Sequence, residues 1–123
     1  MLNDAFLTLA IAVLLGTALA FLHLRTETGL RAPWPLAALH GLLGVGGLGC
    51  LLLALRGPSA ALNQQNGSFE VMSAILFALA AFVGVGIFIT HVLKRRRAGT
   101  LIAIHATLAV SGFVVLLAYL FAG

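Results

Sequence analysis

The sequence predicts an all-α membrane protein: a four-transmembrane-helix, up-down bundle built from a duplicated helical hairpin. The 123-residue chain is 62% hydrophobic and only 8% charged, with a mean hydropathy of +1.15. A soluble domain of this size could not bury so much apolar surface, so its solvent is expected to be lipid. Four apolar stretches, at 5–24, 36–55, 70–93 and 99–122, are each long enough to cross about 30 Å of hydrocarbon. They use nearly the whole chain, which predicts a single transmembrane domain over residues 1–123.

The first span, residues 5–24, shares one feature with a signal peptide, because Ala18-Leu19-Ala20 resembles a cleavage site. The segment before it, Met1-Leu2-Asn3-Asp4, carries no positive charge, and the span has a counterpart later in the chain. We therefore expect a retained membrane helix.

The second and third spans begin with recognisable helix starts. Before the second span stands Pro33-Trp34-Pro35, in which Pro35 suits a first helical turn and Trp34 suits the boundary between lipid and water. The third span follows a polar stretch and opens with Glu70, whose carboxylate favours the positive end of the helix dipole. A proton-transfer role for Glu70 is a minor alternative.

The positive charge is distributed unevenly between the connections. Arg25 and Arg31 lie between spans one and two, and the run from Lys94 to Arg97 lies directly before the fourth span, whereas Arg56 falls on the other side. The positive-inside rule predicts that both basic connections are cytoplasmic and both termini lie on the outer side. We expect a multi-pass protein of a bacterial-type inner (cytoplasmic) membrane. The basic run abuts a span, so it is expected to anchor the topology and meet anionic lipid, and no nucleic acid is expected as a partner.

The chain aligns with itself as two hairpins, about residues 5–55 and 70–122. Offsets of 65 and 68 residues place the second span on the fourth and the first span on the third. All four histidines fall in matching positions: His40 with His105, and His23 with His91. The copies share one orientation, as in parallel repeats related by an axis along the membrane normal.

The histidines gather at the predicted cytoplasmic side. His40 and His105 are expected roughly 8 Å below the membrane edge, and His23 and His91 are expected roughly 3–5 Å below it. Residues one and two turns deeper than the inner pair are small and share its helix faces: Gly44 and Gly47 below His40, and Ala109 and Gly112 below His105. In the same way, Gly16 and Gly84 lie two turns deeper than His23 and His91.

Two accounts fit this pattern of histidines and small residues. In the first, small residues let the helices approach closely, and the histidines hydrogen-bond between helices or contact water. In the second, imidazoles from facing helices ligate haem iron, and the small residues make room for the macrocycle. The histidines in these two depth-matched pairs are all that the chain has, which favours the haem account.

The expected helix order selects one pair of ligands. In an up-down bundle, spans two and four are diagonal neighbours, and macrocycles held on both diagonals at nearly one depth would collide. We therefore expect one haem b between His40 and His105, with His23 and His91 near the propionates. The alternative is two haems with mixed ligand pairs, His23 with His105 and His91 with His40. Bis-histidine ligation fills both axial positions, which favours electron transfer over oxygen binding.

With His40 and His105 on its second and fourth spans and small residues beside them, the chain resembles small four-helix membrane cytochromes b. These hold haem b between two histidines and pass electrons to or from quinones. The ligand placement is also similar to one half of haem A synthase. Such halves carry an acidic residue about one turn before the first histidine, where this chain has Leu36 and Ala37. Haem-modifying chemistry is therefore not expected.

The resemblance implies a membrane-embedded haem b electron carrier that relays electrons between quinone and a partner subunit near the cytoplasmic face. The chain has no flavin or nicotinamide fingerprint, so it is expected to work with another protein subunit or as a homo-oligomer rather than as a complete enzyme. The alternative is a non-redox accessory or assembly subunit of a larger membrane complex. A histidine site for zinc or copper and a small transporter formed by dimerisation are further alternatives.

Overall fold

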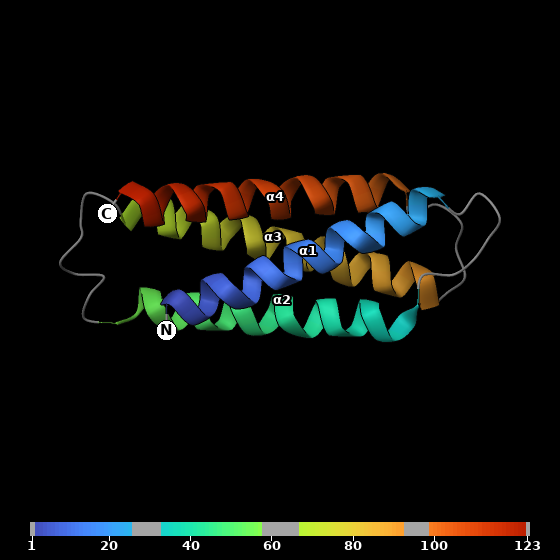
Figure 1. Ribbon diagram of the computed structural model, residues 1–123, viewed down its shortest axis with the longest axis horizontal. Helices are drawn as coiled ribbons and strands as arrows, with labels where there is room; N and C mark the ends of the chain where they lie inside the picture. Colours follow the sequence, from blue (N-terminus) through green and yellow to red (C-terminus); the bar gives the residue numbers. More distant parts are fainter. Residues whose placement is uncertain (1, 26–32, 58–66, 93–98, 123) are drawn as a thin grey trace.

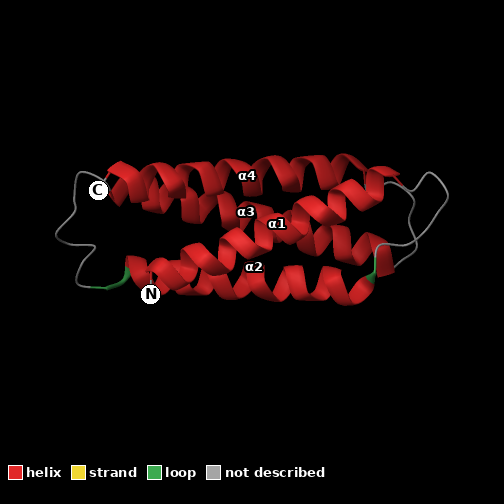
Figure 2. Cartoon of the chain, viewed as in Figure 1, coloured by secondary structure: helices red, strands yellow, loops and turns green. Residues whose placement is uncertain are grey.

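The structure, a computed structural model, describes residues 2–25, 33–57, 67–92 and 99–122. These residues form four α-helices: α1 (Leu2–Arg25), α2 (Trp34–Leu55), α3 (Gly67–Val92) and α4 (Gly99–Ala122). Figure 2 shows helix over nearly all of the described chain. Each helix is long and apolar enough to cross a membrane. The prediction of an all-helical, multi-pass membrane protein is thus confirmed, with helix ends within three residues of the predicted spans.

The helices run up and down, so that α1 begins and α4 ends at the same end of the bundle (Figure 1). Helix α1 packs mainly on α2, and α3 packs mainly on α4, while smaller contacts join α2 to α3 and α1 to α4. The pair α2 and α4 therefore lies on one diagonal. We call the end where α1 begins the terminal end, and the end where α1 stops at Arg25 the basic end.

Two prolines define the start of α2. Pro33 has an extended backbone, with φ −60° and ψ 115°, and Pro35 stands in the first turn, as predicted. The Pro33 carbonyl accepts hydrogen bonds from the backbone N–H groups of Leu36 at 3.0 Å and Ala37 at 3.2 Å. A proline lacks a backbone N–H, so it is tolerated where the helix has no partner for one. The chain is thereby directed into α2 five residues before His40.

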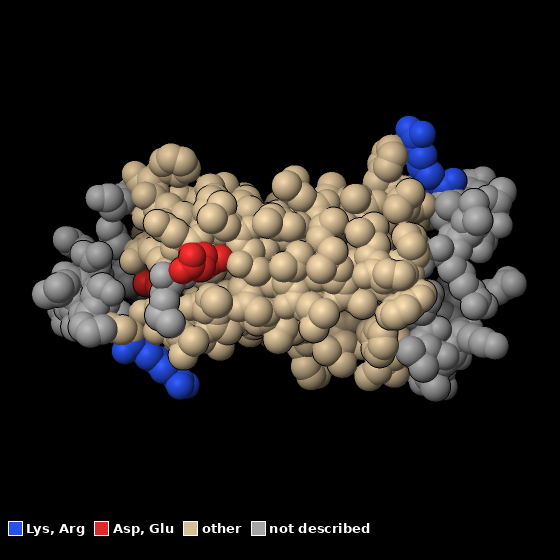
Figure 3. Space-filling view, turned by 60° about the horizontal axis from the view of Figure 1, so that its bottom comes forward, with Lys and Arg blue, Asp and Glu red and all other residues tan. Residues whose placement is uncertain are grey.

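Large apolar side chains cover the outside of the bundle. Leu14, Phe82 and Phe121 are 70%, 81% and 86% exposed. Figure 3 shows an uncharged surface over the middle of the molecule, with Lys, Arg, Asp and Glu side chains near its ends. Such a surface is stable in contact with hydrocarbon, and the absence of charge from the middle fits a membrane-spanning bundle.

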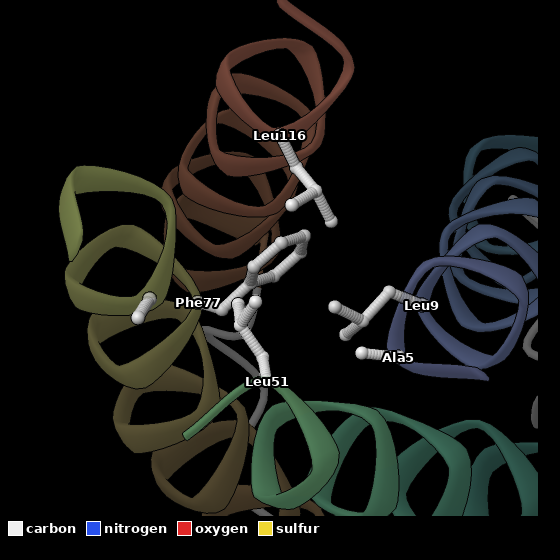
Figure 4. Close-up of a cluster of buried hydrophobic side chains, with 6 residues drawn as sticks. Ala5, Leu9, Leu51, Phe77 and Leu116 are labelled. Carbon is white, nitrogen blue, oxygen red and sulfur yellow. The ribbon is translucent and has the colours of Figure 1, made fainter. Parts of the chain in front are cut away.

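The half of the bundle near the terminal end contains a closely packed core. Figure 4 shows side chains from all four helices meeting there, and among them Leu9, Leu51 and Leu116 have no more than 1% exposure. The rings of Phe6 and Phe113 stack at 5.6 Å between centroids. In the same half, the buried Ser73 hydroxyl donates to the Gly112 carbonyl at 2.9 Å and so joins α3 to α4. Lipid gives no hydrophobic drive for helix association, so this packing and hydrogen bonding hold the helices together.

The described residues of the half near the basic end are more exposed than those of this core. From Val13 to Arg25 in α1 and from Trp34 to His40 in α2, none of the residues is fully buried. The same is true of Ala81 to Thr90 in α3 and Gly99 to His105 in α4. The side chains of these segments are thus at least partly exposed, in contrast to the core at the terminal end.

We expect Leu51→Ala to lower the free energy of unfolding by about 2–5 kcal/mol, because it leaves a cavity among fully packed side chains. Leu53→Ala is the matched control, since Leu53 lies on the same helix but is 52% exposed. Reversible unfolding of the purified variants in detergent micelles measures both values. Equal losses for the two variants would contradict the assignment of this core.

Candidate functional site

His40 of α2 and His105 of α4 meet across the diagonal of the bundle. Their Nε2 atoms lie 3.5 Å apart. Their ring centroids are 5.7 Å apart, with an angle of 83° between the ring planes. The predicted pair of inner histidines is thus brought together, with the same nitrogen of each ring directed at the other.

Each imidazole is fixed by a hydrogen bond to the backbone of the helix that packs most closely on its own. His40 Nδ1 lies 2.8 Å from the Ala12 carbonyl oxygen of α1, and His105 Nδ1 lies 2.7 Å from the Ala80 carbonyl oxygen of α3. A carbonyl oxygen only accepts, so both Nδ1 atoms must carry the proton. In a neutral imidazole this leaves Nε2 with a free lone pair.

The two lone pairs therefore converge on one point between α2 and α4. Two hydrogen-bond acceptors facing each other at 3.5 Å repel, and a positive centre between them removes that repulsion. A proton on one Nε2 would create an N–H···N hydrogen bond, and a metal ion would accept both lone pairs. Metal-binding histidines commonly donate their other ring N–H to a backbone carbonyl, which fixes the tautomer and the ring orientation.

Glycines lie against both imidazoles. A Cβ at Gly16 would be 2.7 Å from His40 Cε1, and a Cβ at Gly84 would be 3.1 Å from His105 Cε1. From the sequence these glycines were expected on the faces of His23 and His91. They do lie on those helices, but the side chains that they contact are the inner histidines of the neighbouring helices.

The four small residues expected to line a macrocycle divide into two kinds. Gly44 and Ala109, one turn from the histidines, are half-buried, and no atom of another helix comes within 4 Å of a Cβ built at Gly44. Gly47 and Gly112, two turns away, are buried at helix contacts. A Cβ on Gly47 would be 2.7 Å from Leu9 Cγ, and one on Gly112 would be 3.2 Å from Leu76 Cβ. Close packing explains this second kind, and their contact with a macrocycle stays a prediction.

The outer histidines lie closer to the basic end than the inner pair does. His23 is exposed in the last turn of α1, seven residues beyond Gly16, which is about 10 Å along a helix. This separation exceeds the few ångströms expected from the spacing of the histidines to the connections. The reason is that the residue of α1 level with the His40 ring is Gly16, which lies deeper than expected. His91 belongs to α3, and its side chain lies outside the described residues, as do the structures of Arg31 and Lys94.

The remaining candidate ligands do not join this pair. Among the residues that the structure describes, no group of three or more His, Cys, Asp or Glu side chains could hold a metal ion. Glu70 is buried, with 4% exposure, but it lies near the terminal end, beyond the apolar core. The pair is therefore a two-nitrogen site, unlike the four-coordinate sites typical of zinc.

Comparison of the chain with models of known families, with curated proteins and with solved structures found no match.

His40 and His105 would be the residues to hold a haem iron, and the separation of their Nε2 atoms can be compared with that role. Metal–imidazole bonds are about 2 Å long, so axial nitrogens on opposite sides of an iron atom lie about 4 Å apart. The observed 3.5 Å would need to increase by roughly 0.5 Å, a small movement of two side chains. Toward the basic end from the pair, the described segments contain no fully buried side chain.

Gly47→Ala tests whether close helix packing explains that glycine. The added methyl group would meet Leu9 Cγ at 2.7 Å and the Leu9 backbone nitrogen at 3.2 Å, so α1 and α2 must separate. We expect a loss of about 1–3 kcal/mol in the free energy of unfolding of the cofactor-free protein. Gly49→Ala is the control, because nothing lies within 4 Å of its Cβ position. Unchanged stability of Gly47→Ala would return this residue to the macrocycle-lining group.

Proposed function

We propose that the chain is a four-helix membrane cytochrome b in which His40 and His105 are the axial ligands of one haem b. The haem supplies reversible one-electron exchange between ferric and ferrous iron. The chain relays electrons between quinone and a partner subunit or soluble donor, at the face of the membrane to which the basic end belongs. Bis-histidine ligation leaves no axial position for oxygen, so the site carries electrons and does not activate a substrate.

The observation that carries this proposal is the paired orientation of the two imidazoles. Each donates Nδ1–H to a helix carbonyl, and each presents Nε2 to the same point. Both rings use Nδ1 as the anchor and leave the nitrogen that commonly binds metal directed at its counterpart. In a pair that only linked helices, a proton shared between the two Nε2 atoms would have to take the place of the metal.

The uneven packing of the bundle supports a position for the cofactor toward the basic end. Fully buried side chains fill the terminal half (Figure 4), whereas the described residues of the basic half include none. Arg25 lies at that end, where its guanidinium group is 4.5 Å from the centroid of the Phe21 ring. A cation at this edge suits the propionate groups of a haem.

The helical register favours His40 and His105 over the mixed pairs. His105 is level with Gly84 and faces His40, whereas His23 is about 10 Å further along α1 than the residue that contacts the His40 ring. Ligation by His23 and His105 would require α1 to slide by about two turns. One haem per chain is thus the arrangement that needs least movement.

The proposal includes a topology and an origin by duplication. The charges of the connections predict that the basic end is cytoplasmic and both termini are outside. The contacts around the histidines recur at the positions that the internal alignment pairs: Ala12 with Ala80, Gly16 with Gly84, Gly47 with Gly112 and Leu51 with Leu116. Such a recurrence supports two copies of one hairpin. We place the protein in a bacterial-type inner membrane.

Two alternative functions predict a different colour and metal content for the purified protein. A non-redox accessory subunit, in which the pair shares a proton and only links α2 to α4, would be colourless and free of metal. A bare metal site is supported by the Nε2 separation of 3.5 Å and would favour an ion that accepts two opposed nitrogen ligands, such as Cu(I), over zinc. That protein would contain about one copper ion per chain and no haem.

Absorption spectra of the oxidised and dithionite-reduced protein, purified from haem-replete cells, test the proposal. We expect a sharp α-band on reduction and a ratio near one haem per chain. His40→Ala and His105→Ala should each abolish this low-spin spectrum, because each removes one axial nitrogen. A colourless wild-type preparation would refute haem binding, and metal analysis of the same sample would then separate the two alternatives.

His23→Ala, compared with His40→Ala, tests whether the chain binds one haem or two. His23 is exposed near the basic end, so we expect its loss to weaken haem retention less than His40→Ala and to leave the low-spin bands in place. Spectra and haem-to-protein ratios of the two variants, prepared side by side, provide the comparison. Equal haem loss would instead support two haems with mixed ligand pairs.

A further inference from the structure

The carbonyl groups that hold the histidines belong to helices, where they already have a partner. In an α-helix the carbonyl of residue i accepts the N–H of residue i+4. For Ala12 that residue is Gly16, and for Ala80 it is Gly84. A carbonyl oxygen has a second lone pair, but a side chain from another helix must be able to reach it.

The residue at i+4 controls that access. Helical side chains point back toward the N-terminus, so each covers the turn before its own Cα. At positions 16 and 84 the chain has glycine, and the space that a Cβ would occupy holds the neighbouring imidazole. The ring atoms of His40 would lie 2.7–3.4 Å from a Cβ at Gly16, and those of His105 would lie 3.1–3.3 Å from one at Gly84.

We propose that Gly16 and Gly84 are positioning residues, each of which uncovers the carbonyl oxygen one turn before it for the histidine of the adjacent helix. His40 thereby donates Nδ1–H to Ala12, and His105 donates Nδ1–H to Ala80. The glycines thus select the Nδ1–H tautomer of both rings and direct both Nε2 atoms at one point. For the tautomers the inference stands on the hydrogen bonds alone; for its effect on haem iron it rests on the proposed function.

The same pair of positions recurs in both halves of the bundle, with the same spacing of four residues between alanine and glycine. Ala12 and Ala80 are themselves buried, with 4% and 3% exposure, so their carbonyl groups are not held by bulk water. Two other glycines of the described helices lie in open space. At Gly46 of α2 and Gly86 of α3, nothing comes within 4 Å of the Cβ position.

The first experiment measures the tautomers in the cofactor-free protein, by ¹⁵N NMR of the histidine side chains at a pH where all imidazoles are neutral. We expect His40 and His105 of the wild type to be protonated at Nδ1. In Gly16→Ala, His40 should move largely to the Nε2–H form while His105 keeps Nδ1–H. Gly84→Ala should shift His105 in the same direction but less, because the contact that it creates is longer, 3.1 Å against 2.7 Å.

Gly86→Ala is the matched control, a glycine of α3 two residues from Gly84 with open space at its Cβ position. It should leave both tautomers unchanged. If either histidine of the wild type carries its proton on Nε2, the inference fails whether or not the protein binds haem. If Gly16→Ala and Gly84→Ala both keep the wild-type tautomers, the glycines have no positioning role. Should Gly16→Ala not fold, Gly84→Ala decides the question alone.

The second experiment uses the haem-loaded protein. We expect Gly16→Ala to lower haem affinity by about 10–100-fold, the usual cost of losing an outer-shell partner of a metal ligand, and Gly84→Ala to lower it less. The electron paramagnetic resonance signal of the ferric wild type should be that of nearly perpendicular imidazole planes, since the rings stand at 83°, and it should change in Gly16→Ala. If the histidines have the expected tautomers but the protein takes up no haem, the proposed function is refuted and the positioning role of the glycines stands.

Discussion

Two hydrogen bonds from imidazole N–H groups to helix carbonyl oxygens determine how this bundle presents its histidines. Within hydrocarbon there is no water to satisfy a polar side chain, and the described carboxylates, Asp4 and Glu70, lie in the first turns of α1 and α3 near the terminal end. The backbone of the neighbouring helix supplies the acceptor instead, at 2.8 Å for His40 and 2.7 Å for His105. Because these bonds use Nδ1, the orientation of each ring and the identity of its free nitrogen follow from them, and the chemistry of the pair follows in turn.

The packing along the bundle axis places this pair at a boundary. On one side, side chains such as Leu9, Leu51 and Leu116 exclude solvent from the interior and tie the helices together. On the other side the described residues are only partly buried or exposed. The closely packed part can hold the register of the four helices, on which the facing of the imidazoles depends. In the proposed function, haem binding would depend on the other part of the same helices.

Much of this organisation could be predicted from the sequence, because it depends on the length of the apolar stretches and on the positions of the histidines within them. Apolar length predicted the four helices, and their up-down order with an inner histidine on the second and the fourth predicted which imidazoles would face each other. The carbonyl partners could not be predicted in this way, since every residue has a backbone carbonyl. The contacts of Gly16 and Gly84 with His40 and His105 could not be predicted either, because spacing within a helix does not reveal the register between helices. Recurrence of alanine and glycine at a spacing of four in both halves was the signal that could have found them.

The contacts that hold each histidine are confined to one pair of helices. His40, the Ala12 carbonyl and Gly16 all belong to α1 and α2, and the second histidine has its own set in α3 and α4. Only the approach of the two Nε2 atoms crosses between the pairs. Each pair of helices is thus a complete half of the site, because it orients its own histidine without contacts from the other pair. Two separate copies of a single hairpin, docked about a two-fold axis, would bring together the same set of atoms. A metal centre bound between the histidines would then join the α1–α2 pair to the α3–α4 pair, across the interface where the helices contact each other least.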